Sequence, residues 1–411
     1  MWTSTQTIVK ILSGIIVNKL IAISLGPAGL AMIGQFQNFI AIALSVANGS
    51  IQTGIVKYAA EFKEDENMLR SLIKSSLLIS LSLSAVVSLS LLVFSEYLSI
   101  KILYSDQYEA VFFFLAFAIF FYSLNLYVLS ILNGFGEIKL LTIINILLSV
   151  LMVLFCFLLV YLYDLSGVLF ALMLTQVVVF FLSIYLMQKI SMRKIFYIDS
   201  IFNAIDKEIV NKLFRFSIAT FSSGMIMTLM LMSLRHIIIQ DSSIELAGIW
   251  EATWRLVSYF NLLFVLPYAI HYLPKFSSHK KLSSIRSDLK EAYKFLIPIA
   301  IIVITFILTF KRDIIELLFS SEFLEMANIL TYVLIAEFFR ILAFTLSNVF
   351  MAKAKVYAIL QNEFIFSLTM VILSYFLIND FGFIGIGYAY FLSSILFLLL
   401  WILKFKNLKI C

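Results

Sequence analysis

Long apolar runs separated by short polar segments dominate the chain. A run such as LLISLSLSAVVSLSLLVF, residues 77–94, has nearly the length of about 20 residues that a helix needs to cross hydrocarbon. A transmembrane barrel would instead show strands of about 10 residues with alternating polarity and frequent turn residues. The runs therefore predict membrane-spanning helices.

The pattern divides the chain into about twelve such helices. They are expected near residues 5–25, 30–60, 71–94, 110–133, 139–163, 166–188, 211–236, 246–272, 292–310, 326–351, 355–378 and 383–403. The first is too long and too polar at its centre for a signal peptide, which predicts a permanent span.

Composition agrees with a membrane protein. Of the 411 residues, 62% are apolar and 13% charged, against about 25% charged in soluble domains. Only four prolines and 14 glycines interrupt the apolar runs. The predicted fold class is thus an all-α polytopic membrane protein.

The distribution of basic residues indicates which loops face the cytoplasm. They concentrate in two loops and near the end of the chain: Lys189, Arg193, Lys194, Lys207 and Lys212; Lys275, Lys280, Lys281, Arg286 and Lys290; Lys353, Lys355, Lys404, Lys406 and Lys409. The positive-inside rule places these segments and both termini in the cytoplasm. Because the net charge of +6 is spread over short loops rather than one stripe, topology explains it better than nucleic-acid binding does.

The chain also repeats itself. KILYSDQY (101–108) is similar to ELLFSSEF (316–323), and YDLSGVLFAL (163–172) is similar to FGFIGIGYAY (381–390). An even number of spans in each half gives both halves the same orientation in the membrane. We therefore expect two six-helix lobes, 1–190 and 211–411, joined by a cytoplasmic linker at 191–210.

No catalytic residues, metal ligands or cofactor motif stand out. The three histidines have no metal-ligand spacing, and there is no G-x-x-x-x-G-K-[ST] loop. The two cysteines, Cys156 and Cys411, suggest no disulfide framework. The sequence thus predicts a protein that is not an enzyme and needs no cofactor.

Polar groups inside the first span are candidates for substrate binding, because a charge in a span is costly and commonly faces a wet cavity. These are Lys10, Asn18 and Lys19. Both lysines lie about 8–9 Å from a membrane surface, so snorkelling is the alternative explanation. Nine residues at about 100° each place them on opposite faces of a straight helix, unless Gly14 allows a distortion.

The second span adds further candidates for substrate binding: Gln37, Asn48, Gln52 and Lys57. Gln37 and Asn48 are about three helical turns apart and share a face, which we expect to line water. An interfacial pair with Glu61, one turn away, is an equally good account of Lys57.

The second half carries charged pairs at helical spacing. Glu251 with Arg255 and Glu337 with Arg340 can each form an ion pair on one helix face. Arg255 and Arg340 are candidates for substrate binding, with purely internal ion pairs as the alternative. Glu363 has no basic residue at helical spacing. A buried carboxyl without a partner gains protons more readily, which makes Glu337 and Glu363 proton-coupling candidates.

Several segments resemble the Wzx-type flippases of lipid-linked oligosaccharides, in the O-antigen and lipid III branch of the multidrug/oligosaccharidyl-lipid/polysaccharide exporter superfamily. These segments, which span nearly the whole chain, are TIVKILSGIIVNKLIAISLGPAGLAMIGQFQNF (7–39), TGIVKYAAEF (53–62), AGIWEATWRL (247–256), HYLPKFS (271–277), LLFSSEF (317–323) and MAKAKVYAILQNE (351–363).

The resemblance implies a V-shaped, alternating-access transporter in the inner membrane of a Gram-negative bacterium. Its substrate would be an undecaprenyl-pyrophosphate-linked repeat unit of O-antigen or enterobacterial common antigen, moved from the cytoplasmic to the periplasmic leaflet. The lipid bilayer is then a partner, and a polymerase and a chain-length regulator are further candidates. Lysines at positions 10, 19 and 57 match basic positions of similar family members, which favours a cationic cavity for the pyrophosphate.

Two other functions stay open. A proton- or sodium-coupled multidrug exporter of the same superfamily should carry unpaired carboxylates in its N-terminal lobe, where this chain carries lysines and amides. A membrane polysaccharide polymerase or glycosyltransferase should carry catalytic acids on a large outer loop, and the outer loops predicted here are short.

Overall fold

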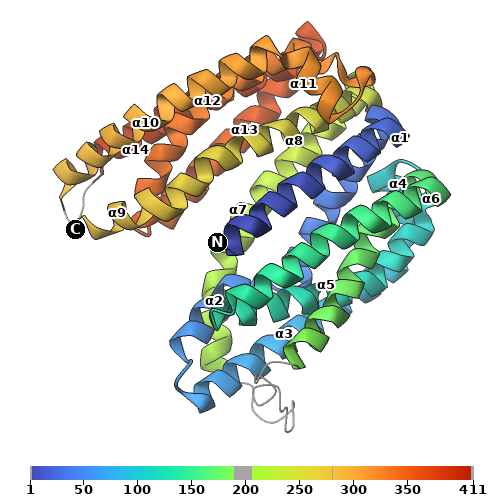
Figure 1. Ribbon diagram of the computed structural model, residues 1–411, viewed down its shortest axis with the longest axis vertical. Coiled ribbons are helices and arrows are strands. Elements are labelled where there is room, and N and C mark those ends of the chain that lie inside the picture. Colours follow the sequence, from blue (N-terminus) through green and yellow to red (C-terminus); the bar gives the residue numbers. More distant parts are fainter. Residues whose placement is uncertain (1, 189–205, 280, 409–411) are drawn as a thin grey trace. The chain divides into compact units, whose positions relative to one another are not determined.

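The computed structural model describes residues 2–188, 206–279 and 281–408, which contain helices and turns and no strand (Figure 1). The helices of the first half are α1 (Trp2–Ala47), α2 (Gln52–Glu61), α3 (Glu66–Val93), α4 (Ser95–Leu103), η1 (Asp106–Tyr108), α5 (Glu109–Gly134) and α6 (Ile138–Gln188). Those of the second half are α7 (Lys207–Asp241), α8 (Ile244–Pro267), η3 (Tyr268–Tyr272), α9 (Leu273–Ser278), α10 (Leu282–Thr309), α11 (Lys311–Leu318), η4 (Ser321–Phe323), α12 (Met326–Ala352), α13 (Val356–Phe381) and α14 (Ile384–Lys406).

The predicted all-α membrane fold is confirmed. Nine helices among the described residues are long and apolar enough to cross a membrane. Two of them are double: α1 has a non-helical residue at Gly26, and α6 has two at Tyr163 and Asp164. Dividing α1 and α6 at these residues turns the nine helices into eleven segments. The more polar helix α8 is the twelfth, so the described ranges contain twelve long helical segments, the number that the sequence predicts.

One predicted span is wrong in detail. Residues 30–60 are not one helix, because α1 ends at Ala47 and α2 begins only at Gln52. Gly49 and Ser50, between the two helices, have φ angles of 60° and 51°. This left-handed backbone interrupts a right-handed helix, and the sequence signal for it is the pair Asn48-Gly49.

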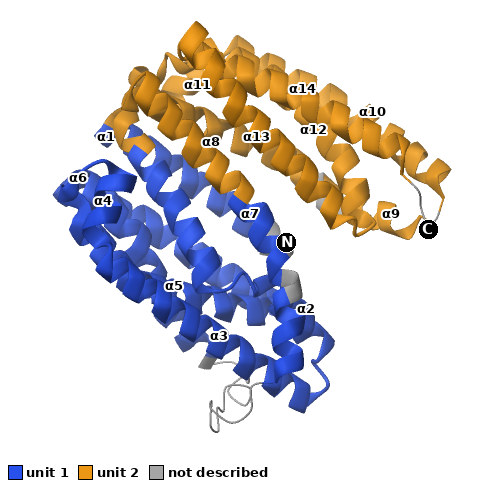
Figure 2. Cartoon of the chain, turned by 180° about the vertical axis from the view of Figure 1, so that it is seen from behind, with its two compact units in different colours: residues 1–25, 32–225 blue, residues 26–31, 226–411 orange. Residues whose placement is uncertain are grey.

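The chain divides into two compact units, residues 1–25 with 32–225 and residues 26–31 with 226–411 (Figure 2). The short segment 26–31 belongs to the second unit because α8 packs tightly against it. A Cβ atom added at Gly248 would lie 1.7 Å from the carbonyl oxygen of Pro27. Most of the predicted linker at 191–210 lies outside the described residues, as do the basic residues Lys189, Arg193, Lys194, Lys280 and Lys409.

The same order of elements occurs in both units. A short helix, a single 3-10 turn and a long helix follow one another as α4, η1 and α5 in the first unit and as α11, η4 and α12 in the second. α5 packs against α2, α3, α4 and α6, and α12 packs against α8, α10, α13 and α14. In both cases 56% of the apolar stretch is buried, against at most 39% in the other candidate spans. α5 and α12 are thus the central helices of their units.

A second repeated feature joins the last two long helices of each unit. Asp164 and Gly382 occupy equivalent positions in the sequence repeat, and both have positive φ angles, 48° and 64°. Three residues later, a Cβ atom added at Gly167 would lie 1.9 Å from the carbonyl oxygen of Leu159, and at Gly385 2.1 Å from that of Leu377. Only glycine allows the returning helix to start this close to the preceding one.

Candidate functional site

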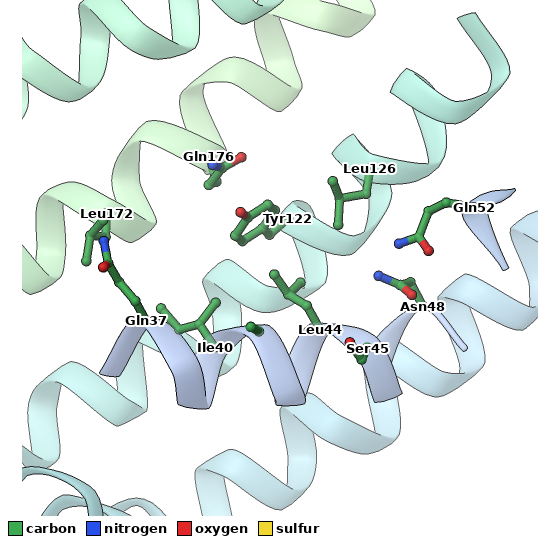
Figure 3. A pocket seen from close by; sticks show the side chains of 11 residues that line it. Gln37, Ile40, Leu44, Ser45, Asn48, Gln52, Tyr122, Leu126, Leu172 and Gln176 are labelled. Atoms are coloured by element: carbon green, nitrogen blue, oxygen red, sulfur yellow. The ribbon is translucent and has the colours of Figure 1, made fainter. Parts of the chain in front are cut away.

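A polar cavity of about 430 Å³ lies inside the first unit (Figure 3). Its lining comes from α1, α2, α5 and the second half of α6, and combines four amides, two hydroxyls and five aliphatic side chains. These residues are Gln37, Ile40, Ala41, Leu44, Ser45, Asn48, Gln52, Tyr122, Leu126, Leu172 and Gln176. Three of the predicted substrate-binding residues, Gln37, Asn48 and Gln52, are therefore brought to one cavity.

The interruption between α1 and α2 positions two of these amides. Asn48 Oδ1 accepts a hydrogen bond of 2.8 Å from the backbone N–H of Ser50. A backbone nitrogen can only donate, so this bond fixes the orientation of the amide. What Asn48 can offer a ligand is its NH2 group, and Figure 3 shows Asn48 and Gln52 pointing to the same space.

A buried chain of polar groups holds the amide on the opposite wall. Asn125, which is fully buried on α5, donates a hydrogen bond of 3.4 Å to Gln176 Oε1 on α6. Ser183 Oγ, about two turns further along α6, lies 3.1 Å from Asn125 Oδ1. Polar contacts of this kind link helices inside a membrane, where an unpaired amide is costly. The sequence analysis did not single out Gln176, because in sequence it is one polar residue in an apolar run.

None of the predicted cationic residues of the first unit lines this cavity. Lys10 and Lys57 are exposed, and Lys57 Nζ lies 4.7 Å from the centroid of the Tyr58 ring. Lys19 is half-buried, beside Asn18, which is buried. α1 is helical at Gly14, so Lys10 and Lys19 lie on opposite faces of a regular helix.

The second unit contains a buried charge cluster around Glu251 on α8. The predicted contact with Arg255 forms, with Nε 2.9 Å from Glu251 Oε1. A second arginine, Arg235 on α7, places Nη2 2.9 Å from Glu251 Oε2. The side chain of Arg235 is 2% exposed, so this charge is compensated inside the unit. The sequence analysis missed Arg235, because residues that meet across two helices are not three or four positions apart in the sequence, the spacing by which a pair on one helix is recognised.

A second charge cluster surrounds Glu337 at the centre of α12. Arg340 Nε lies 3.6 Å from Glu337 Oε1, as its spacing predicts. The hydroxyl of Tyr390, on α14, donates a hydrogen bond to the same carboxylate oxygen. Among the described residues, neither Glu337 Oε2 nor Arg340 Nη1 has a hydrogen-bond partner. This buried carboxylate, with one oxygen unsatisfied among the described residues, is one of the two acids that the sequence predicts for proton coupling.

Arg340 also connects this cluster to α13. Its guanidinium lies 4.6 Å from the ring centroid of Phe366 and within electrostatic range of Glu363. Glu363 thus has a cation near it that lies on another helix, which its sequence neighbours do not reveal. Asn362, beside it in the sequence, is fully buried.

Comparison with known proteins places this fold and these residues in a family. A family model described as "Polysaccharide biosynthesis protein" matches residues 1–280, more than half of the chain. The chain belongs to the polysaccharide biosynthesis protein family. Among curated members of known function, it is similar to the lipid III flippases of Escherichia coli (strain K12) and Shigella flexneri, each 23% identical over 399 residues that cover 97% of this chain and 95% of the relative.

Solved structures share the fold of this polysaccharide biosynthesis protein. A multidrug resistance MATE family transporter of the MOP superfamily, in an inward-facing conformation, matches with a TM-score of 0.80 at 17% identity, covering 97% of this chain and 95% of that one. The lipid II flippase MurJ, in an inward closed conformation, matches with a TM-score of 0.72 at 17% identity, covering 98% of this chain and 86% of that one. The likeness establishes that this chain has the fold of these two solved proteins.

The described residues of this family member contain no group of three or more histidine, cysteine or acidic side chains placed to hold a metal ion. The polar groups that the structure does gather are amides in the first unit and compensated charges in the second. Such groups can bind a polar ligand.

Proposed function

We propose that this protein is a flippase that moves an undecaprenyl-pyrophosphate-linked oligosaccharide from the cytoplasmic to the periplasmic leaflet of a bacterial inner membrane. The observation that carries the proposal is the full-length similarity to two lipid III flippases, which covers 97% of this chain. The role is transport rather than catalysis. It accords with described residues that place amides around a cavity in the first unit and pair buried charges in the second.

The physical task fits such a protein. A sugar-pyrophosphate head group cannot cross hydrocarbon unaided, because moving charges and hydroxyls out of water is costly. The polyprenyl tail, by contrast, can stay in lipid throughout. The protein therefore needs only to shelter the head group, and amide groups lining a cavity in a membrane-spanning unit are a suitable environment for its hydroxyl-bearing part.

In this proposal the basic residues bind the substrate and the acidic residues couple transport to a proton gradient. Lys19 attracts the pyrophosphate by a charge-assisted hydrogen bond. Lys57, and Lys10 on the opposite face of α1, are further cationic candidates for contact with the substrate. Arg255 and Arg340 are further candidates for contact with the substrate. Glu337 and Glu363 couple transport to a proton gradient. Both termini lie in the cytoplasm, and a polymerase and a chain-length regulator act on the product.

Deleting the gene in its native host tests the proposal. The undecaprenyl-linked intermediates are extracted and compared with those of a complemented strain, together with the surface polysaccharide. We expect a lipid-linked repeat unit to accumulate on the cytoplasmic face while the surface polymer is lost. Normal surface polymer with altered drug accumulation would contradict the proposal and favour a multidrug exporter.

A further inference from the structure

The lining of the cavity of the first unit mixes polar and apolar side chains and contains no charged one. Tyr122 is the single ionisable residue among its eleven lining residues, and its hydroxyl is neutral at physiological pH. The remaining polar groups are the amides of Gln37, Asn48, Gln52 and Gln176 and the hydroxyl of Ser45. A pyrophosphate would find no cation in this lining, and burying it there without one would be costly.

The same lining suits a sugar. A sugar ring presents hydroxyl groups, which both donate and accept hydrogen bonds, and C–H faces, which pack against apolar groups. Amides also donate and accept, and here they alternate with aliphatic residues such as Ile40, Leu44 and Leu172. The volume of about 430 Å³ falls within the roughly 300–1,000 Å³ of ordinary small-molecule sites.

Two of the amides are oriented before any ligand arrives. The bond from Ser50 N–H engages Asn48 Oδ1, and the bond from Asn125 engages Gln176 Oε1. Both residues are thus left with an NH2 group to donate, from opposite walls of the cavity (Figure 3). Fixed donors bind a matching acceptor without the cost of ordering flexible side chains.

We infer that this cavity is a subsite for the sugar residues of the lipid-linked oligosaccharide, separate from the groups that bind its pyrophosphate. The inference rests on the proposed function and adds to it the site that recognises the sugar residues. A site built to hydrogen-bond hydroxyl groups discriminates against ligands that lack them, because its own buried polar groups are then left unpaired. The lysines give affinity for any pyrophosphate lipid, and the cavity gives selectivity for the sugar.

Binding of two lipids to the purified full-length protein tests this inference. One probe is the lipid-linked repeat unit extracted from the host, and the other is undecaprenyl pyrophosphate without sugar. The informative variants are Gln52→Leu and Tyr122→Phe, since no hydrogen bond joins either side chain to another described residue. Asn145→Leu is the control, because this half-buried amide of the same unit bonds Leu141 O on its own helix and lies outside the cavity.

We expect the wild-type protein to prefer the sugar-bearing lipid. Each cavity variant should bind that lipid about tenfold more weakly while its affinity for the bare lipid stays unchanged, and Asn145→Leu should match the wild type. Equal weakening for both lipids, or no weakening for either, would overturn the inference. A wild-type protein that binds both lipids equally would overturn it while leaving the proposed function standing, whereas one that binds neither lipid would overturn both.

Discussion

Arg235 and Glu251 form an ion pair between α7 and α8, with 2.9 Å between Nη2 and Oε2, although they lie sixteen residues apart in the sequence. Glu251 also binds Arg255 on its own helix, so one carboxylate serves two guanidinium groups. The side chains of Arg235 and Glu251 are only 2% and 8% exposed. The carboxylate of Glu251 thus compensates positive charge from two helices in the interior of the second unit.

Removing the shared carboxylate should therefore destabilise the protein strongly. Glu251→Gln leaves the buried guanidinium of Arg235 and the partly buried one of Arg255 without this anion, and we expect a loss of about 3–5 kcal/mol in the free energy of unfolding. Arg255→Ala should cost less, because Arg235 still compensates Glu251. Thermal unfolding in detergent measures both. Glu208→Gln, which breaks an exposed pair with Lys212, is the control and should change little. Equal stability of the Glu251 and Glu208 variants would contradict the structural role.

Glu337 should carry the dependence of transport on a proton gradient. Glu337→Gln removes the carboxyl group that the proposed coupling requires and keeps the shape, so the variant should bind substrate normally while its flipping rate no longer responds to a pH gradient. Transport of the lipid-linked repeat unit in proteoliposomes, with and without the gradient, measures this. Glu325→Gln, an exposed acid just before α12, should respond as the wild type does. A Glu337→Gln variant that keeps a full response would exclude Glu337 as the coupling group.

Lys19 should contribute to affinity for the pyrophosphate. Lys19→Ala removes a charge-assisted hydrogen bond worth about 1.5–3 kcal/mol, so we expect at least a tenfold loss of affinity for undecaprenyl pyrophosphate. Surface polysaccharide should fall at unchanged protein level. Lys101→Ala, which removes an exposed lysine of α4 in the same unit, is the matched control. Unchanged binding and surface polymer in Lys19→Ala would contradict the role.

The two repeated glycines should not tolerate a side chain. Gly167→Ala and Gly385→Ala place a Cβ atom about 2 Å from a backbone carbonyl oxygen, so the returning helix has to shift. We expect each to lower the free energy of unfolding by about 1–3 kcal/mol, the usual cost of overpacking. Gly224→Ala, on α7, has open space around the new Cβ atom and should be neutral or slightly stabilising. Thermal unfolding of the three variants side by side checks the difference.

The ion pairs of Lys275 on α9 should make stability depend on pH in the alkaline range. The hydrogen bond with Glu291 on α10, at 2.7 Å, raises the pKa of Lys275 above its usual value. A raised pKa means that the folded state holds the proton more tightly than the unfolded state. The contribution of Lys275 is therefore complete below about pH 10.4, the ordinary lysine pKa, and is lost as pH rises through the higher value of the folded state.

Melting temperatures of the wild type and Lys275→Met between pH 8 and pH 11.5 test this. We expect the variant to melt lower at pH 8 and the difference to narrow at the alkaline end. Lys294→Met, which removes an exposed lysine of α10, should differ from the wild type by the same small amount at every pH. A difference in melting temperature between the wild type and Lys275→Met that stays constant with pH would show that the ion pairs of Lys275 do not stabilise the fold.

The sequence by itself determined the all-helical membrane fold, its twelve long segments and its internal repeat. These follow from local physics: every backbone group in a membrane must find its partner within the helix, so apolar length alone reveals the spans. The sequence also predicted the pairs Glu251 with Arg255 and Glu337 with Arg340, because residues three or four positions apart share a helix face. It also placed Gln37 and Asn48 on one face.

Only the tertiary structure decided which helices meet. Arg235 reaches Glu251, Tyr390 reaches Glu337, and Gln176 joins the amides of α1 and α2 around one cavity. The pair Asn48-Gly49 is a turn signal in the sequence, but only the structure showed that the left-handed residues Gly49 and Ser50 end α1 and divide the predicted span 30–60. Contacts between helices leave no periodicity in a sequence, because they depend on how the helices pack and not on their spacing along the chain.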